Sequence, residues 1–462
     1  MRSLLSRFGP LSFYREALAI ALPVMLQLFI MSMVSLIDNF MVAGLGDVSM
    51  AAVNVANQIN FIYIIVLNTI CQAGGIYIAQ FRGGGNTEGM KHAYRFKIIF
   101  TAAASVIYFI LCRTIPHRMI AVMIMENSAR EEIIVLGTGY LKLVSWTLLP
   151  MAVSYSIGSS FREIARPQVP LVISGAATVV TTVGNWILIY GNLGAPRLEV
   201  FGAAYATIIA RVFEVSFFLI YVSAVKAPFF VSITGLFNVH RRLLGTILFK
   251  SGMIFVSELS WVTSETIMTA MYNRRGGAEV VAGMAAGWTI ANIFFLLFGG
   301  IWIASGILVG GSLGAGKLDD ARRRAEWLKS GSIVAAIIIA IPGAVVSVPL
   351  VQLVFSNLSA AARNNCIGLV FVVLAYLPLW SFLNVQFAIS RAGGDTAAGM
   401  YADVSVNTLL FVPGAILLSL FTSMPPVPMF ALLKLTDFVK LLVCRHFLRK
   451  ERWVKNLTHD ST

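Results

Sequence analysis

The amino-acid sequence predicts an all-α polytopic membrane protein with twelve transmembrane helices, arranged as two parallel six-helix repeats. Three observations support this fold class. The chain of 462 residues is 58% hydrophobic and only 12% charged, whereas a soluble domain carries about 25% charged residues. Apolar runs long enough to cross a bilayer as helices recur along the whole chain. One long apolar segment also occurs twice, half a chain apart.

The predicted spans follow from runs near the length of about 20 residues that crosses the hydrocarbon core as a helix. Their approximate bounds are 16–43, 51–81, 95–112, 133–157, 168–190, 201–225, 246–272, 280–312, 328–355, 364–389, 400–422 and 427–448. Pro23 and Pro378 lie inside two of these spans, where they can bend the helix.

The internal repeat relates residues 45–86 to residues 276–317 without a gap, at a constant offset of 231 positions. Gly46 corresponds to Gly277, and the two copies close on similar glycine-rich turns. A weaker correspondence, at an offset of 229 positions, links Arg162 with Arg391. Because an even number of spans separates the copies, both halves have the same orientation in the membrane.

This symmetry divides the chain into four predicted parts. Residues 1–225 form an N-terminal six-helix lobe and residues 246–450 form a C-terminal six-helix lobe. Residues 226–245 are predicted to be a cytoplasmic linker with an amphipathic stretch lying on the membrane. Residues 451–462 are predicted to be a cytoplasmic tail.

The basic charge, +14 overall, is distributed unevenly between the two sides of the membrane. With the N-terminus inside and alternating spans, most of the 35 Lys and Arg residues fall on one side, Arg162, Arg391 and Lys97 among them. The opposite side receives Arg113, Arg118, Arg130, Arg197, Arg274, Arg275 and Arg363. The positive-inside rule therefore places both termini in the cytoplasm. The charge reports topology and contact with anionic lipid, and nucleic acid is not an expected partner.

Polar residues inside the spans are candidate sites, because a charge at the bilayer centre costs about 2.5–3.5 kcal/mol on insertion scales. Asp38, followed by Asn39, lies near the outer end of the first span. A carboxylate there can exchange a proton or a sodium ion with the outside. Thr181 and Asn185 form an i, i+4 polar pair in the fifth span. These four residues are the candidates for ion coupling.

The seventh span carries Glu258, Trp261 and Glu265, whose spacing places them on one helical face. An aromatic ring between two carboxylates favours an organic cation, through charge attraction and cation–π contact. An alternative is that one carboxylate joins an interhelical hydrogen bond and the other lies at the membrane interface. The three residues are the main candidates for substrate binding.

Three further residues are candidates for substrate contact: Asn57 and Gln58 in the amide-rich second span, and Asp437 in the last span. The amides can equally serve interhelical hydrogen bonding. Arg211 and Glu214 form an i, i+3 pair that is expected to be neutral and structural. The four cysteines show no metal or redox spacing, and neither a metal nor a cofactor is expected.

Several ordered segments together resemble one family. They are LP at 22–23, IDNFMVAGLG at 37–46, AAV at 51–53, the turn 79–85, NWILIYG at 185–191, GAAYAT at 202–207 and RAGGDT at 391–396. Each piece is a weak motif, but their order along nearly the whole chain is specific. The chain resembles the bacterial branch of the multidrug and toxic compound extrusion (MATE) family.

The resemblance implies two six-helix lobes around a V-shaped cavity, and export of amphipathic, often cationic compounds driven by inward flow of protons or sodium ions. The first-helix acid of the family corresponds to Asp38, which supports a coupling role there. Two positions depart from the family pattern. Asn185 stands where some members have Asp, and Ser381 stands where others have an acid. The coupling ion is therefore left open between proton and sodium.

These inferences favour a secondary antiporter and not an enzyme, active as a monomer in a bacterial cytoplasmic membrane with a small-molecule substrate. The alternative is a lipid or polysaccharide-precursor flippase. Such a flippase should carry several Arg or Lys residues in its cavity, whereas the first-half spans offer Lys142 and the paired Arg211. A receptor or scaffold without turnover is a third hypothesis. An imposed ion gradient that drives no transport would favour it.

Overall fold

The computed structural model describes residues 7–124, 129–238 and 240–458, and its regular secondary structure in these ranges is helical. The first half contains α2 (Leu11–Ala43), α3 (Asp47–Gly83), α4 (Thr87–Thr114), α5 (Pro116–Met123), α6 (Arg130–Val144), η1 (Ser145–Thr147), α7 (Leu148–Glu163), α8 (Gln168–Tyr190), η2 (Asn192–Gly194) and α9 (Glu199–Ala224). The second half contains α10 (Arg241–Asn273), α11 (Ala278–Gly314), α12 (Leu318–Val354), α13 (Ala360–Ala392), α14 (Ala397–Val406), η4 (Asn407–Phe411), α15 (Val412–Phe421), α16 (Pro426–Lys434) and α17 (Thr436–Arg449).

The membrane fold class is confirmed, because 11 helical stretches among the described residues are long and apolar enough to cross a bilayer. The twelfth predicted span is interrupted: α16 ends at Lys434 and α17 begins at Thr436, so neither piece alone has the length of a span. The eleventh span contains a π-helical segment, η4, at Asn407–Phe411. Such π-segments are frequent at functional sites, and both irregularities lie beside the charged cluster described below.

The turns repeat as the sequence symmetry predicts. Gly85 after α3 has φ 69°, and Gly316 after α11, at the corresponding position, has φ 74°. Glycine adopts this left-handed conformation without steric cost. The weaker correspondence is also repeated in the backbone, because Ala165 has φ 58° and Gly394 has φ 79°. Both predicted pairs of turns therefore have the same local geometry in the two halves.

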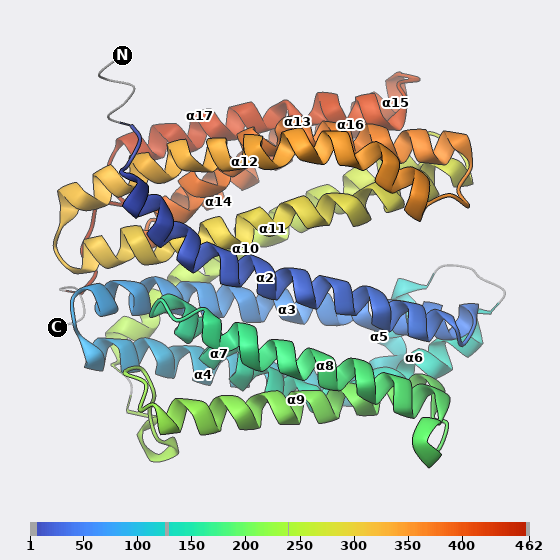
Figure 1. The fold of residues 1–462 in the computed structure, drawn as a ribbon, viewed down its shortest axis with the longest axis horizontal. Coiled ribbons are helices and arrows are strands. Elements are labelled where there is room, and N and C mark those ends of the chain that lie inside the picture. Colours follow the sequence, from blue (N-terminus) through green and yellow to red (C-terminus); the bar gives the residue numbers. More distant parts are fainter. Residues whose placement is uncertain (1–6, 125–128, 239, 459–462) are drawn as a thin grey trace.

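The two halves fold as two helical lobes (Figure 1). The first helix of each lobe, α2 or α10, begins packed against the other lobe. Phe13 and Ile20 of α2 are buried in a cluster formed otherwise by the second lobe. Leu243 and Ile247 of α10, the equivalent helix, are buried in a cluster of the first lobe. Each of these helices thus contacts both lobes, and this position makes it a mechanical link between them.

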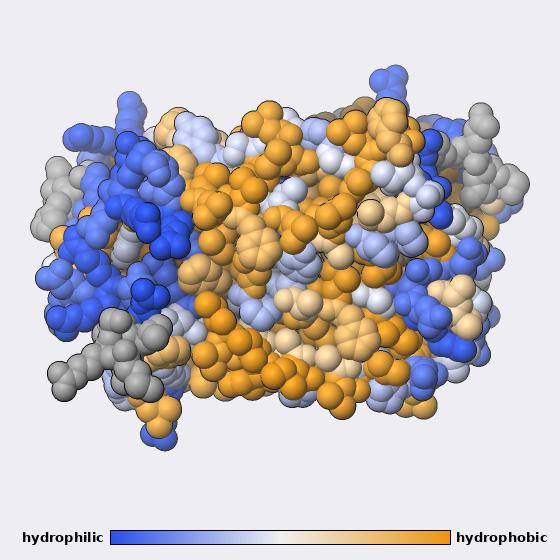
Figure 2. Space-filling view, turned by 90° about the horizontal axis from the view of Figure 1, so that it is seen from above, coloured by the Kyte–Doolittle hydropathy of each residue, from blue (hydrophilic) through white to orange (hydrophobic). Residues whose placement is uncertain are grey.

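The surface of the molecule shows a wide apolar band between two polar ends, as Figure 2 shows for one face. Exposed apolar side chains such as Ile220, Ile338 and Val345 contribute to the lipid-facing surface that the sequence predicts. Both ends of the chain lie at the same polar end of the molecule (Figure 1). That end is called the termini end below, and the opposite one the far end.

The structure adds detail to the predicted linker and tail. Helix α10 begins at Arg241, so the last residues of the predicted 226–245 linker are helical, and the described part before it holds turns and the short η3 (Ile233–Gly235). The tail is packed against the protein: Trp453 is 5% exposed and Leu457 is 3% exposed. Apolar side chains in this otherwise polar segment explain its docking.

Candidate functional site

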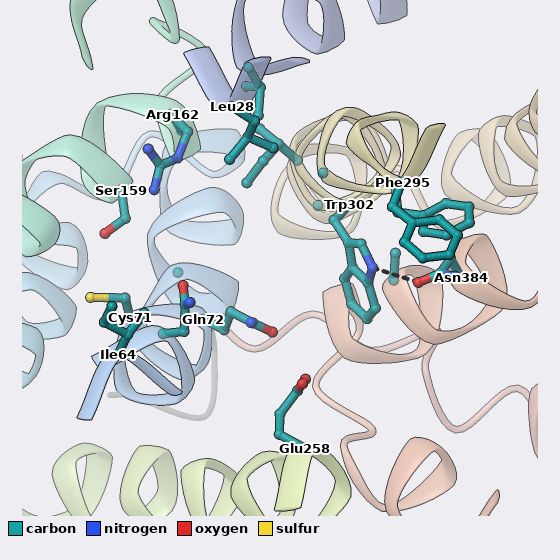
Figure 3. Close-up of a pocket in the computed structure, with 18 of the residues that line it drawn as sticks. Leu28, Ile64, Cys71, Gln72, Ser159, Arg162, Glu258, Phe295, Trp302 and Asn384 are labelled. Atoms are coloured by element: carbon teal, nitrogen blue, oxygen red, sulfur yellow. Dashed lines mark hydrogen bonds between the residues drawn. The ribbon is translucent and has the colours of Figure 1, made fainter. Parts of the chain in front are cut away.

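A cavity of about 1040 Å³ lies between the two lobes. Its walls come from α2, α3, α7, α8 and α9 of the first lobe and from α10, α11, α13, α14, α16 and α17 of the second. Figure 3 shows residues of both walls facing each other, with Arg162, Ser159 and Cys71 on one side and Trp302, Phe295 and Asn384 on the other. A space of this size and mixed lining accommodates a drug-sized molecule.

The cavity is closed at the termini end by tight packing between the lobes. A Cβ atom on Gly83 of α3 would collide with the backbone of Gly311 of α11, and one on Gly314 would collide with the backbone of Gln80. Helices α11 and α3 lie close here and separate toward the far end (Figure 1). The close approach of two helix backbones requires glycine at these positions.

Gln80 joins three chain segments at this closed end. Its Nε2 atom donates to Ala392 O at 2.8 Å and to Lys455 O at 3.3 Å, and its Oε1 atom accepts from Leu457 N at 2.8 Å. The side chain is 0% exposed. These bonds tie the first lobe to the end of α13 and to the docked tail.

Glu258 is one of the sequence candidates that the structure brings into the cavity. Its Oε1 atom lies 3.2 Å from Nη1 of Arg391, and the same Nη1 donates to Oε1 of Gln72, in the first lobe, at 2.7 Å. The Arg391 guanidinium also stacks over the ring of Trp302, 4.6 Å from its centre. Trp302 donates in turn to Asn384 at 2.9 Å (Figure 3). Glu258 is therefore a paired carboxylate at the meeting of the two lobes.

Glu265 and Asp437 belong to a second charged cluster in the wall of the second lobe. Glu265 pairs with Lys434, whose ammonium lies 4.7 Å from the ring centre of Phe411. Asp437 accepts from Nε1 of Trp380 at 2.8 Å. Lys434 at the end of α16 and Asp437 near the start of α17 both line the cavity on this wall.

Lys440 joins the same cluster to α14. Its Nζ lies 3.4 Å from Asp403 and 3.5 Å from Asp437, and Asp403 also accepts a hydrogen bond from Ser257 of α10. Lys440 and Asp403 are 7% and 8% exposed. Buried charges persist only when paired, and this network pairs each of them.

The wall of the first lobe carries two more ion pairs and one unpaired cation. Arg211 binds Glu214 at 2.7 Å, as predicted. Lys97 Nζ lies 2.5 Å from Glu163 Oε2, and Lys97 is completely buried, although the sequence placed it among the cytoplasmic segments. Arg162 lines the cavity, and its side chain has no ion pair or hydrogen bond among the described residues.

The predicted ion-coupling residues form a separate site between α2 and α8. Asn185 Nδ2 donates to Asp38 Oδ1 at 2.8 Å. Asn185 is 2% exposed, and its Oδ1 atom has no hydrogen-bond partner among the described residues. Thr181, one helical turn away, donates to Ala177 O at 3.1 Å. Asp38 does not line the central cavity, so any effect of ion binding on the cavity must pass through the helices.

The remaining candidates are placed differently. Asn39 is partly buried beside Asp38. Trp261 lines the cavity and is 48% exposed. Asn57 and Gln58 are exposed and do not line the cavity. Substrate contact by these two amides stays a prediction, and the amides of α3 that line the cavity are those nearer the termini end.

Sequence reasoning missed several lining residues, including Arg162 and Arg391, which it assigned to loops. Both lie in the last turns of helices, α7 and α13, and point inward. Their correspondence in the internal repeat indicated that they occupy equivalent positions in the two lobes. The pairing of Asp403 with Lys440 was not predicted, since a single helix does not reveal which other helix faces it.

The family model described as MatE matches residues 23–187 and, a second time, residues 254–417. The chain belongs to the MATE family. The two matches correspond to the two lobes. The family consists of transporters and not enzymes, and its bacterial branch, predicted from the motifs, agrees with the bacterial relatives that follow.

Characterised and uncharacterised relatives align over part of the chain. The "Uncharacterized transporter YisQ" of Bacillus subtilis is 24% identical over 65% of this chain and 65% of its own length. The "Multidrug resistance protein MdtK" of Yersinia enterocolitica is 23% identical over 67% of this chain and 66% of its own length. The chain thus spans just under two thirds of these two relatives.

Solved MATE structures match the fold over nearly the full length. A mutant of the Vibrio cholerae MATE transporter VcmN has a TM-score of 0.84 at 17% identity, covering 96% of this chain and 98% of its own. A structure described as the outward-facing conformation of a multidrug resistance MATE family transporter has a TM-score of 0.81 at 16% identity, covering 98% of both chains. At these identities the likeness establishes the fold.

Proposed function

We propose that this MATE protein is a secondary antiporter that exports amphipathic compounds by alternating access, driven by a proton or sodium gradient. The observation that carries the proposal is the large cavity between two lobes, closed at one end by contacts between glycine backbones. In this proposal the termini end faces the cytoplasm, as the distribution of Lys and Arg predicts. The molecule is then in a state that opens outward.

Helix α2 provides a physical link between ion binding and lobe position. Its far half is attached to the first lobe by the bond between Asp38 and Asn185, whereas Phe13 and Ile20 are packed in the second lobe. Pro23 lies between these two attachments and weakens the helix there. A proton or sodium ion that neutralises Asp38 changes the outer attachment, and the change reaches the second lobe through the same helix.

Substrate and coupling ion must favour opposite states or compete, because a ligand with equal affinity for both states shifts no equilibrium. The cavity offers an exposed aromatic surface at Trp261, next to Glu258 and Glu265, for an apolar or cationic part of a substrate. Both carboxylates carry basic partners, so a cation bound here competes with Arg391 or Lys434.

The test is dye transport in vesicles with an imposed proton or sodium gradient, comparing wild type with Asp38→Asn. The amide of the variant can keep a hydrogen bond to Asn185, but it cannot ionise and therefore cannot bind and release a proton. We expect folded protein whose gradient-driven export is abolished. Undiminished export by this variant would refute the coupling role of Asp38.

The flippase alternative gains one observation and loses another. Basic residues do line the cavity, as such a protein requires, but Arg391, Lys434 and Lys440 are each paired with a carboxylate, which leaves Arg162 as the lining cation without a partner among the described residues. A flippase for anionic precursors should present several unpaired cations, so the antiporter is favoured. Flipping of a fluorescent anionic lipid by the reconstituted protein, without export of dyes, would reverse this choice.

A further inference from the structure

The two walls of the cavity are related by the internal repeat, and two positions around one arginine differ between them. Arg391 corresponds to Arg162. Trp302, which stacks on Arg391, corresponds to Cys71 at the offset of 231 positions. Glu258, the partner of Arg391, lies in α10, and the corresponding position of α2 is neutral in either register: Gln27 at the offset of 231, or Leu28 at the offset of 230 given by the helix bounds. All of these residues line the same cavity.

The surroundings of Arg162 therefore lack both groups that occupy Arg391. A neutral side chain of α2 stands in place of the carboxylate, and a thiol stands in place of the indole. The nearest acid in the chain, Glu163, is already bound by Lys97 at 2.5 Å. Figure 3 shows the Arg162 side chain on the same side of the cavity as Cys71 and Ser159, across from Trp302.

The charges of the cavity lead to the same point. Each lining carboxylate among the described residues has a basic partner: Glu163 with Lys97, Glu214 with Arg211, Glu258 with Arg391, Glu265 with Lys434, and Asp403 and Asp437 with Lys440. Arg162 is the lining cation that remains without a partner among these residues. A guanidinium without an ion-pair partner attracts an anion, and its planar fork matches an oxyanion.

We propose that Arg162 binds an oxyanion of the transported molecule: the carboxylate of an amphipathic solute or the phosphate of a lipid headgroup. The aromatic surface of Trp261 and Trp302 receives the apolar part of the same molecule from the opposite wall. The protein then selects compounds that carry an anionic group besides an aromatic body, and not cations alone. The proposal rests on the transport function proposed above for its physiological role, but the binding site itself can be tested without transport.

The experiment compares two dyes that differ in one charge: rhodamine B, whose free carboxylate makes it zwitterionic at neutral pH, and its cationic ethyl ester. Binding to purified protein in phosphatidylcholine nanodiscs is followed by fluorescence polarisation. We expect wild type to prefer rhodamine B, and Arg162→Gln to weaken rhodamine B by roughly tenfold, the range of one lost charge-assisted hydrogen bond. The affinity for the ester is expected to stay within about twofold, since it has no group for the guanidinium.

Two further variants separate a binding role from a structural one. Arg162→Lys keeps the charge without the fork and should retain part of the preference for the acid. Gln27→Glu supplies the carboxylate that the second lobe has in Glu258, and should remove the preference by pairing Arg162 internally. If Arg162→Gln weakens both dyes equally, or neither, the proposal is wrong.

A parallel titration with dihexanoylphosphatidylglycerol distinguishes the two sources of the oxyanion. Displacement of rhodamine B by this lipid, together with lipid binding that Arg162→Gln weakens, assigns the site to headgroups. Preference for rhodamine B without lipid binding assigns it to amphipathic solutes, and the absence of any Arg162-dependent binding in either titration overturns the proposal. If binding discriminates as expected but vesicles export neither dye, the transport function fails and the anion site stands.

Discussion

Replacing Gln80 with methionine is expected to open the termini end of the cavity. Methionine has nearly the volume and flexibility of glutamine, so packing is preserved. The substitution removes the bonds to Ala392 O, Lys455 O and Leu457 N. The bond to Ala392 O joins the lobes directly, and the other two hold the tail, which is docked across both lobes. We expect all three bonds to break when the end opens.

The magnitude follows from the number and burial of these bonds. A typical intramolecular hydrogen bond contributes about 0.5–1.5 kcal/mol net, so the three together contribute about 3 kcal/mol to closure. Since each 1.4 kcal/mol is about a factor of ten, the ratio of closed to open molecules should fall roughly a hundredfold. If nearly all wild-type molecules are closed at the termini end, the variant should be a detectable mixture of closed and open molecules.

The assay is double electron–electron resonance between spin labels at Thr87→Cys and Lys317→Cys, two exposed positions at the termini end of different lobes. The variant should show a second, longer distance. The matched control is Gln386→Met, because Gln386 is also buried, at 2% exposure, but its Oε1 atom has no partner among the described residues. An unchanged distance distribution in the Gln80 variant, or an equal change in the control, would refute the reasoning.

Three other predictions follow from the same structure. Lys97→Met leaves Glu163 buried without its cation and should destabilise the protein by about 3–5 kcal/mol, measured as thermal unfolding in detergent, while the double variant that also carries Glu163→Gln recovers most of the loss. Removing residues 451–462 exposes the apolar surface on which the tail is docked, and it should enlarge the open population in the same spin-label experiment. An unchanged distance distribution would mean that the tail covers this surface without stabilising the closed end. Single cysteines at Thr87 and Asn357 should react with an impermeant maleimide from opposite sides of the membrane, the first from the cytoplasm, and reaction from one side would contradict the topology.

Much of the fold was predictable because the bilayer imposes helix length and polarity on each segment separately. The offset between the two copies of the repeat predicted the paired turns at Gly85 and Gly316. The break at Leu435 was not predictable, because no proline or glycine interrupts the helix there. The docking of the tail had only the apolar residues Trp453 and Leu457 as a signal.

The sequence identified the acidic candidate residues of the site but not the basic residues that pair with them. Glu258, Glu265 and Asp437 were identified from their cost in the membrane, and all three line the cavity. Their partners lie far away in sequence: Arg391 is 133 positions from Glu258, and Lys434 is 169 positions from Glu265. Periodicity describes one helix at a time, so it cannot reveal which helices face each other.

The side from which the cavity is reached tests the account most directly. Trp261→Cys places a thiol on an exposed cavity position. The variant also carries Cys71→Ser, because Cys71 lines the same cavity, and the other native cysteines are buried. An impermeant maleimide is added to either side of vesicles, with the coupling ion absent or saturating, for proton and sodium in turn. The account predicts labelling from outside when Asp38 is free and from the cytoplasmic side when it is occupied, with no switch in the Asp38→Asn variant. Labelling from the same side under every condition would contradict alternating access coupled through Asp38.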